Sequence, residues 1–386
     1  MLSLRLCVFT GFILRFTVAI FNAYFGPSIG AEYDAQSFHL LASEIAHDLS
    51  FNNFEITWIY PQLLGIFYML TTDSLFLGCL LSCFAWSLSA YFLIGSMNLL
   101  MVSRVDQIKV MLIYAILPTS IFFTAITLRE PYQLLFVNLQ IYAALKICYR
   151  STVPNWIMLI FACISVGFLH GALLAFAIIL LIFFIFFKQI NKLQNLQLLK
   201  LLIYGLIVSV VWSYIFTAFG DLTTYKIDSG ISAAIESFNE KASLLEVRTN
   251  YRNAAIISNN WELGPFLISS ALQYLFEPFP WHVQNLGDLV LSFEGLLRGY
   301  LIYRAYKVWQ ISSYTCKQPL FLIFFLYLVL TIIFAVGTVN WGTSSRHNVV
   351  ALGLLLLASF GVSRGGERAK KLSPKIESKN LGMGSE

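Results

Sequence analysis

Long apolar stretches dominate the chain and limit what it can fold into. A helix that crosses a bilayer needs about 20 apolar residues, and somewhat shorter helices are tolerated. Ten stretches predict membrane-spanning helices, at residues 6–25, 75–102, 109–127, 131–149, 155–170, 171–188, 200–219, 286–304, 319–339 and 349–362. Only 12% of the 386 residues are charged, whereas soluble domains contain about 25%. The sequence therefore predicts an all-α polytopic membrane protein.

Basic residues indicate how these helices are oriented, because cytoplasmic loops carry an excess of Lys and Arg. With ten spans, every basic cluster falls on one side of the membrane: Arg104 and Lys109, Lys146 and Arg150, Lys188, Lys192 and Lys200, Arg304, Lys307 and Lys317, and Arg364, Arg368, Lys370 and Lys371. Both termini are then cytoplasmic. We expect a multi-pass protein of the inner (plasma) membrane.

An eleventh apolar stretch, at residues 58–72, tests this orientation. If it crossed the membrane, every later basic cluster would move to the wrong side. It has only about 13 apolar residues and contains Tyr60-Pro61 near its start, which favours an interfacial or re-entrant helix. The chain is therefore divided into a transmembrane domain, 1–363, with external loops at 26–74 and 220–285.

The two long external loops are predicted to carry juxtamembrane helices of their own. Apolar residues recur at helical spacing between residues 231 and 245, which is typical of an amphipathic helix. Residues 264–276 form a further short apolar piece. After residue 364 the chain is polar, and a disordered cytoplasmic tail is expected at 364–386.

The first external loop is acidic, because residues 26–57 contain five Asp or Glu and no Lys or Arg. Glu32 and Asp34 stand two residues apart soon after the first span. On an extended loop, two such carboxylates can point into one cavity and act as general base and supporting acid, or as metal ligands. The alternative is an ordinary solvated acidic loop.

Two arginines are predicted to lie at the external membrane surface. Arg129-Glu130 forms a tight turn between two spans, and Arg346-His347 precedes the last span. A guanidinium group binds phosphate through two parallel hydrogen bonds, so both arginines are candidates for holding a lipid phosphate. The alternatives are an Arg129–Glu130 pair that anchors a hairpin and an Arg346 that only snorkels to the interface.

Four further polar residues lie in or beside the predicted spans. His170 marks another external turn and is a candidate for substrate binding, although a single His is more often a packing residue. Glu294 and Arg298 stand four residues apart within a span, in the order that favours an intrahelical ion pair. Arg15 is equally deep in the first span, and the sequence identifies no partner for it.

Taken in order, these features resemble the GT-C superfamily of membrane glycosyltransferases. Members carry an acidic motif in the first external loop, and Glu32-Tyr33-Asp34 is similar to its ExD form. The same loop ends in a helix that opens with a His-Pro-Pro-Leu-like sequence, of which Tyr60-Pro61-Gln62-Leu63 looks like a degenerate version. A Leu-Ser-Pro type span then leads to an external Arg-x-Asp turn, which Leu117-Pro118-Thr119-Ser120 and Arg129-Glu130-Pro131 resemble.

The resemblance covers residues 5–150 and is carried by order and position. The chain departs from the pattern in three ways. Its Tyr60-Pro61 motif has one proline where the family has two, it has a Tyr where the family has His, and it lacks a large C-terminal soluble domain. The resemblance implies transfer of a sugar from a polyprenyl-phosphate carrier at the external face, with Asp34 and Glu32 catalytic. Arg129, Glu130, His170, Arg346 and His347 would bind substrate. It leaves a divalent metal ion open and implies membrane lipid, but no nucleic acid, as a partner.

Two other functions fit the same features. O-antigen-type polysaccharide polymerases are also polytopic, use undecaprenyl-linked sugars and rely on external arginines and a long external loop. A flippase or transporter for a lipid-linked oligosaccharide is the second alternative. Transporters usually combine broken helices with buried ionisable residues and paired halves, and the sequence shows no half-to-half symmetry. An enzyme is therefore the leading hypothesis.

Overall fold

The structure is a computed structural model that describes residues 3–26, 32–47, 59–190, 249–251, 263–312 and 314–361. Within these residues the regular elements are helices, and one isolated β-bridge joins Asn250 to Asn340. The all-α prediction is confirmed for this part of the chain. The predicted span at 200–219, the amphipathic helix at 231–245 and the tail at 364–386 lie outside the described residues.

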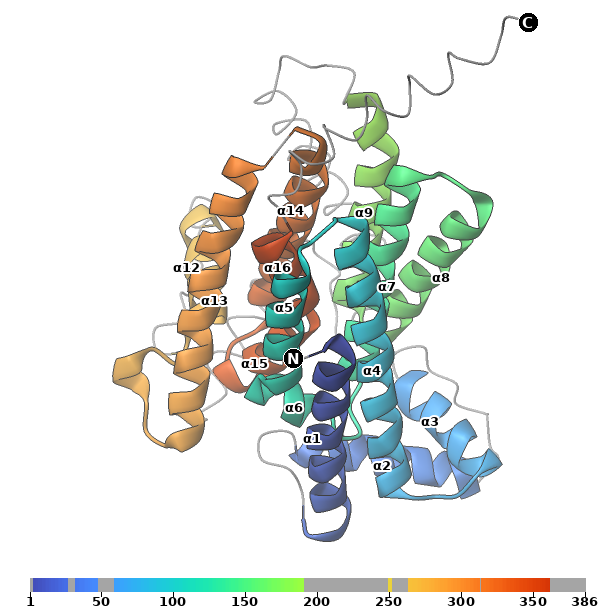
Figure 1. Ribbon diagram of the computed structural model, residues 1–386. Helices are drawn as coiled ribbons and strands as arrows, with labels where there is room; N and C mark the ends of the chain where they lie inside the picture. The colour runs from blue at the N-terminus through green and yellow to red at the C-terminus, as the bar shows by residue number, and fades with distance from the viewer. Residues whose placement is uncertain are drawn as a thin grey trace, which may run out of the picture.

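The helices run mostly along one direction and form a bundle (Figure 1). They are α1 (Leu4–Tyr24), α2 (Glu32–His47), α3 (Ile59–Leu70), α4 (Leu75–Leu99), α5 (Arg104–Ile116), α6 (Pro118–Phe123), α7 (Glu130–Tyr149), α8 (Val153–Leu169), α9 (Gly171–Ile190), α12 (Leu263–Phe276), α13 (Leu286–Ile311), α14 (Tyr314–Gly337), α15 (Trp341–Val350) and α16 (Leu352–Phe360). A short 3-10 turn, Pro280–His282, precedes α13.

Several helices suit a bilayer. In the described residues, three are long and apolar enough to cross one: Leu4–Tyr24, Leu75–Leu99 and Pro319–Gly337. Further apolar helices are shorter, such as Val153–Leu169. Large apolar side chains on outer faces, such as Phe9, are exposed, as contact with lipid requires. The chain is thus a membrane protein, while the count of ten spans stays a prediction.

The two ends of the bundle differ in charge. The links from α4 to α5, from α7 to α8 and from α13 to α14 lie at the upper end in Figure 1. Arg104 begins α5, Lys146 lies in the last turn of α7, and Arg150 follows that helix. We call this the basic end. The opposite end, called the loop end, holds α2, α3, α6 and α15 (Figure 1).

Helix α3 is too short to cross a membrane. Its 12 residues span about 18 Å at the rise of an α-helix, against a hydrocarbon core of about 30 Å. It packs against α2, and a Cβ atom on Gly65 would lie 2.8 Å from the backbone oxygen of Ala42. This close approach needs a glycine. The helix agrees with the predicted juxtamembrane helix at 58–72.

We therefore expect Asp73, after α3, to lie on the opposite side of the membrane from Gly366. Single cysteines at the two positions, introduced into a variant without native cysteines, would be labelled in intact cells by a membrane-impermeant thiol reagent. Only the cysteine at residue 73 should react, because both termini are predicted to be cytoplasmic. Labelling of residue 366 but not 73 would contradict the prediction, because residue 73 would then be cytoplasmic, either through a reversed orientation or because residues 58–72 cross the membrane. Equal labelling would mean that an even number of spans separates the two positions.

The predicted span at 109–127 is wrong as one helix, because it breaks at Leu117-Pro118. Proline has no backbone N–H and forces the preceding residue out of the helical conformation. Leu117 accordingly has φ −60° and ψ 121°. The break deprives the carbonyl groups of Tyr114 and Ala115 and the N–H group of Thr119 of helical partners. Such groups need other partners inside a membrane protein.

Two charged residues from other helices supply these partners. Arg15 of α1 donates to the carbonyl oxygens of Ala115 at 2.9 Å and Tyr114 at 3.4 Å. Glu294 of α13 accepts from the N–H of Thr119 at 2.9 Å and from its hydroxyl at 2.6 Å. A cation at a helix C-terminus and an anion at an N-terminus both match the helix dipole. The buried Arg15 thus has partners that the sequence did not reveal.

The expected ion pair between Glu294 and Arg298 is not formed. Arg298 instead donates through Nε to the carbonyl oxygen of Leu275, in the last turn of α12, at 3.0 Å. Each of the two residues binds the end of a different helix. The prediction from the i, i+4 spacing was wrong because backbone groups at helix ends compete for both side chains.

The predicted last span, 349–362, is also interrupted. Helix α15 begins at Trp341 after the N-cap residue Asn340, whose side chain accepts from the N–H of Thr343 at 2.7 Å. The chain turns at Ala351 and continues as α16. Helix α15 is polar yet buried, and it packs against α6 and α7. This packing brings Arg346 to the beginning of α7.

Candidate functional site

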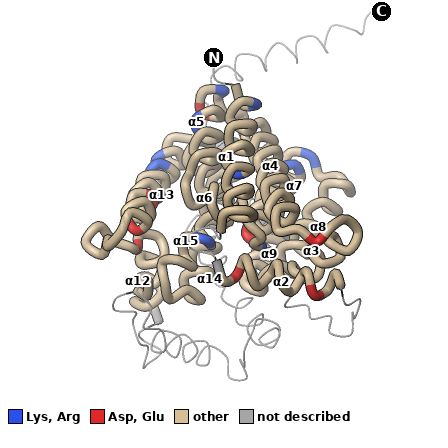
Figure 2. Tube along the Cα trace, turned by 90° about the horizontal axis from the view of Figure 1, so that it is seen from below, with Lys and Arg blue, Asp and Glu red and all other residues tan. Residues whose placement is uncertain are grey.

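A cluster of charged side chains lies at the loop end, where α2, α7 and α15 meet. Arg346 of α15 donates through Nη2 and Nε to the same oxygen of Glu130, at 2.7 and 3.1 Å. Its Nη1 donates to the carboxylate of Asp34 in α2. Viewed from below, basic and acidic residues meet beside α15 (Figure 2). Arg346 thus joins carboxylates 96 residues apart in the sequence.

The two carboxylates differ in exposure. The side chain of Asp34 is 55% exposed, whereas that of Glu130 is 0% exposed. Burial disfavours the charged form of Glu130, but Arg346 and Arg129 outweigh burial and hold the pKa of its carboxyl below the ordinary value. Glu130 is therefore ionised at neutral pH, and it neutralises the buried Arg346. Asp34 is the carboxylate that solvent can reach.

Arg129 completes the cluster, but it is not paired as Arg346 is. It precedes α7 and interacts electrostatically with Glu130, Arg346 and Asp34. Nevertheless it forms no ion pair within 4.0 Å with any carboxylate that the structure describes, and its buried Nε has no hydrogen-bond partner there. Of the two guanidinium groups, that of Arg129 is the one left to bind an anion.

Two histidines lie beside the charges. The rings of His170 and His347 are 5.6 Å apart, and the His347 ring stacks on Phe334 at 4.4 Å. Nδ1 of His170 accepts from the backbone N–H of Ala172 at 3.2 Å, so the proton of a neutral ring is on Nε2. Burial and the two arginines lower the pKa of His347 well below its usual range. His347 is therefore neutral at pH 7.

The structure brings together six of the seven residues singled out in the sequence. They are Asp34, Arg129, Glu130, His170, Arg346 and His347. The backbone of Glu32 begins α2, and its side chain lies outside the described residues. The expected extended loop was wrong, because residues 32–34 form the first turn of a helix. Residues two apart on a helix do not face each other, so the helical backbone does not favour the convergence of carboxylates that an extended loop would allow.

The structure also gives three other residues roles that the sequence did not predict. Glu130 pairs with Arg346 and not with its neighbour Arg129, so the Arg129–Glu130 anchor is not formed. Sequence reasoning also missed Gln133, which is fully buried one turn after Arg129. The spacing of four residues on a helix would have pointed to it. Tyr60 was noted only as a departure from a motif, yet its buried ring contacts Tyr132 at 5.4 Å.

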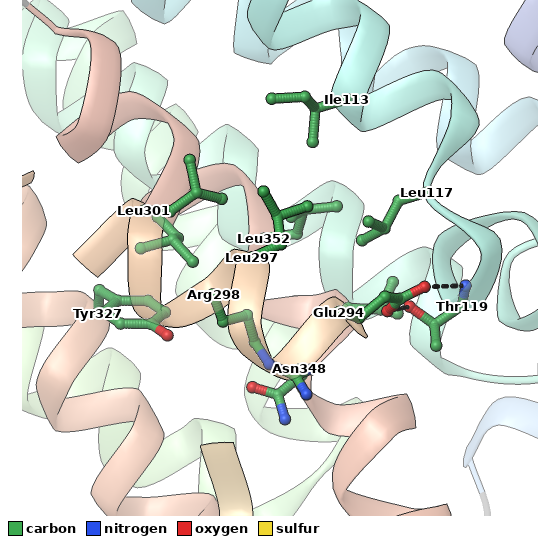
Figure 3. Close-up of a pocket in the computed structure, with 12 residues that line it drawn as sticks. Ile113, Leu117, Thr119, Glu294, Leu297, Arg298, Leu301, Tyr327, Asn348 and Leu352 are labelled. Atoms are coloured by element: carbon green, nitrogen blue, oxygen red, sulfur yellow. Dashed lines mark hydrogen bonds between the residues drawn. The ribbon is translucent and has the colours of Figure 1, made fainter. Parts of the chain in front are cut away.

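A small pocket with polar lining residues lies deeper in the bundle. A pocket of about 20 Å³ is lined by Glu294, Arg298, Tyr327 and Asn348 among apolar residues of α5, α13 and α16 (Figure 3). Glu294 points at Thr119 there, as the dashed line shows. That volume is room for about one water molecule. The pocket is too small for a sugar, and its charged residues cap helix ends.

Potential metal ligands do not cluster in the part of the chain that the structure describes. Among the described residues, no group of three or more His, Cys, Asp or Glu side chains could hold a metal ion. Comparisons with models of protein families, with curated proteins and with solved structures find no match. The charged cluster is therefore the feature of the chain that bears on its function.

Proposed function

We propose that the chain is a membrane-embedded glycosyltransferase that takes a sugar from a polyprenyl-phosphate carrier at the external membrane face. The observation that supports this most is the meeting of Asp34, Arg129, Glu130 and Arg346 at one end of an apolar bundle. These residues come from three distant segments. Glu130 and Arg346 are buried, Arg129 is partly buried, and Asp34 is exposed. The resemblance of residues 5–150 to GT-C enzymes points the same way.

In this mechanism the acceptor hydroxyl attacks the anomeric carbon of the sugar. The bond between that carbon and the phosphate oxygen breaks, and its electron pair leaves with the phosphate. Asp34 takes the proton of the hydroxyl as general base, which suits the one solvent-accessible carboxylate of the cluster. Arg129 stabilises the charge that develops on the leaving phosphate. Glu130 and Arg346 hold each other and orient Asp34.

The experiment is incubation of the purified protein with polyprenyl-phosphate-linked sugars and candidate acceptors, followed by chromatography of the lipid and aqueous fractions. A transferred sugar, or an extended chain in the case of a polymerase, supports the proposal. Absence of product with every donor and acceptor, from a folded protein, would count against it.

A transporter of a lipid-linked solute is the second candidate, and the two broken helices favour it. Helices α5 and α6 break at Leu117-Pro118, α15 and α16 break at Ala351, and α6 packs against α15. Discontinuous helices often form the binding sites of transporters. However, Arg15 and Glu294 occupy the free backbone groups at the first break. Little is left there to bind a solute, so the enzyme remains our proposal.

Substitution of Arg129 by Lys should lower transfer activity at least tenfold and leave stability nearly unchanged. Lysine keeps the charge but loses the planar fork that binds two phosphate oxygens. Arg346→Lys should lower activity and also stability, because one ammonium group cannot replace three hydrogen-bonding nitrogens. Arg150→Lys, at an exposed position of the basic end, is the control. If Arg129→Lys is as active as the wild type, Arg129 is only an interfacial anchor.

A further inference from the structure

The beginning of α7 concentrates buried polar atoms that have no hydrogen-bond partner among the residues that the structure describes. These atoms are Nε of Arg129, Oε2 of Glu130, both side-chain polar atoms of Gln133 and the hydroxyl of Tyr60. Buried polar groups in folded proteins nearly always have a hydrogen-bond partner. Several exceptions at one place therefore indicate a group that binds there, water or ligand.

These atoms belong to one location. Gln133 follows Arg129 by four residues and Glu130 by three, and side chains at both spacings are neighbours on a helix. Tyr60 reaches the same turn from α3, since its ring packs against Phe38 at 5.2 Å and Tyr132 at 5.4 Å. Its hydroxyl also interacts electrostatically with Glu130. The unpartnered atoms thus lie on the side of the charged cluster that adjoins Glu130.

The kinds of atoms define the ligand. Nε of Arg129 and the amide NH₂ of Gln133 need acceptors, whereas the ionised Glu130 and the amide oxygen of Gln133 need donors. The Tyr60 hydroxyl can serve as either. An ionised phosphate offers acceptors almost alone and leaves Glu130 and Gln133 without donors. Sugar hydroxyls offer both.

We infer that Gln133, Tyr60 and the free oxygen of Glu130 bind the hydroxyl groups of a sugar whose phosphate is held by Arg129. This deepens the proposed function, on which it rests, by assigning the sugar-binding residues of the site. Gln133 is then a specificity-determining residue, because its amide presents a donor and an acceptor side by side. The pocket near Arg298 plays no part in this binding.

Replacing Gln133 with an apolar residue should affect stability and ligand binding in opposite directions. An unpartnered buried amide destabilises the free protein, so replacing it with an apolar side chain of similar size is stabilising or neutral. The same replacement removes contacts to the ligand. Gln133→Leu should therefore raise the Tm of the free protein, by roughly 2 °C or more, and weaken binding of the sugar phosphate about tenfold. A residue that only supports the fold would behave in the opposite way.

The experiment measures Tm in a detergent without a sugar head group. The probes are two pairs: inorganic phosphate against glucose, galactose and mannose 1-phosphates, and polyprenyl phosphate against its hexosyl forms. For the wild type, at least one sugar-bearing probe should raise Tm more than its sugar-free partner. A difference only in the second pair identifies a lipid-linked ligand, and a difference in the first shows that the lipid is dispensable.

The variants then test the assignment. Gln133→Leu, and Tyr60→Phe should the first variant fail to fold, should lose the extra shift that the sugar produces and keep the shift due to phosphate. Gln140→Leu is the matched control, because Gln140 is buried on the same helix and donates to Ala162. It should keep both shifts. Equal shifts within both pairs for the wild type, or an unaltered sugar shift in Gln133→Leu, would overturn the inference. Transfer activity is read separately, so failure of either claim is recognised by itself.

Discussion

Replacing Asp34 with Asn is expected to lower the rate of sugar transfer by about 10²–10⁴-fold, the usual loss on removing a general base. Asparagine has the same size and can still accept a hydrogen bond from Arg346, but it cannot take a proton. Because the side chain of Asp34 is 55% exposed, its contribution to stability is small. Expression and Tm should therefore stay close to those of the wild type while product formation falls.

The control for this variant is Glu44→Gln, which removes another carboxylate from an exposed position of α2 and should leave the rate unchanged. If Asp34→Asn retains nearly normal activity, the base lies elsewhere. His347 would then be the next candidate. The hydroxyl of Thr338 donates to the carbonyl of Phe334 and can accept from Nδ1 of His347 at 3.4 Å. That arrangement leaves Nε2 of His347 free to take a proton.

Replacing Glu130 with Gln is expected to cost about 3–5 kcal/mol in the free energy of unfolding, because it removes the buried partner of a buried charge. The loss should appear as a lower midpoint of denaturation in mixed micelles. The double variant with Arg346→Gln should be less destabilised than the sum of the single variants, since no unpaired charge remains. Asp106→Asn, which breaks the exposed pair with Lys109 at 3.4 Å, should cost at most about 1 kcal/mol.

The carboxylate of Glu130 also makes the stability of the fold depend on pH. The pKa of Glu130 is lowered in the folded protein, so its pairing stabilises the fold fully above the ordinary pKa of a glutamate, about 4.3. This stabilisation is lost as the pH falls through the lower folded value. Glu130→Gln should lack that part of the acid transition. Additive effects of the Glu130 and Arg346 substitutions would show that the two side chains do not stabilise each other.

The positions of most helices could be read from the sequence, because apolar length and turn residues are local properties. The predicted spans 75–102, 131–149 and 155–170 end within a few residues of α4, α7 and α8. The break before Pro118 was missed even though proline predicts one. An apolar stretch with the right length hides an internal break whose free backbone groups are bound by Arg15 and Glu294 from other helices.

The candidate site could be predicted only in outline. Asp34, Arg129 and Arg346 were expected at one membrane face because each adjoins the end of a predicted span. Their pairing could not be predicted, since it depends on α15 packing against α6 and α7. Gln133 was missed for a related reason. A single buried Gln becomes informative only when its neighbours show that it has no partner.

The central claim, that the charged cluster catalyses transfer and does not merely carry a lipid, is tested most directly in vesicles. The purified protein would be reconstituted with a fluorescent polyprenyl-phosphate-linked sugar and an acceptor, and both product and movement of the lipid across the bilayer would be followed. We predict that the wild-type protein forms product and that Asp34→Asn forms almost none. Movement of the lipid without any product, in both proteins alike, would contradict the account and favour a transporter.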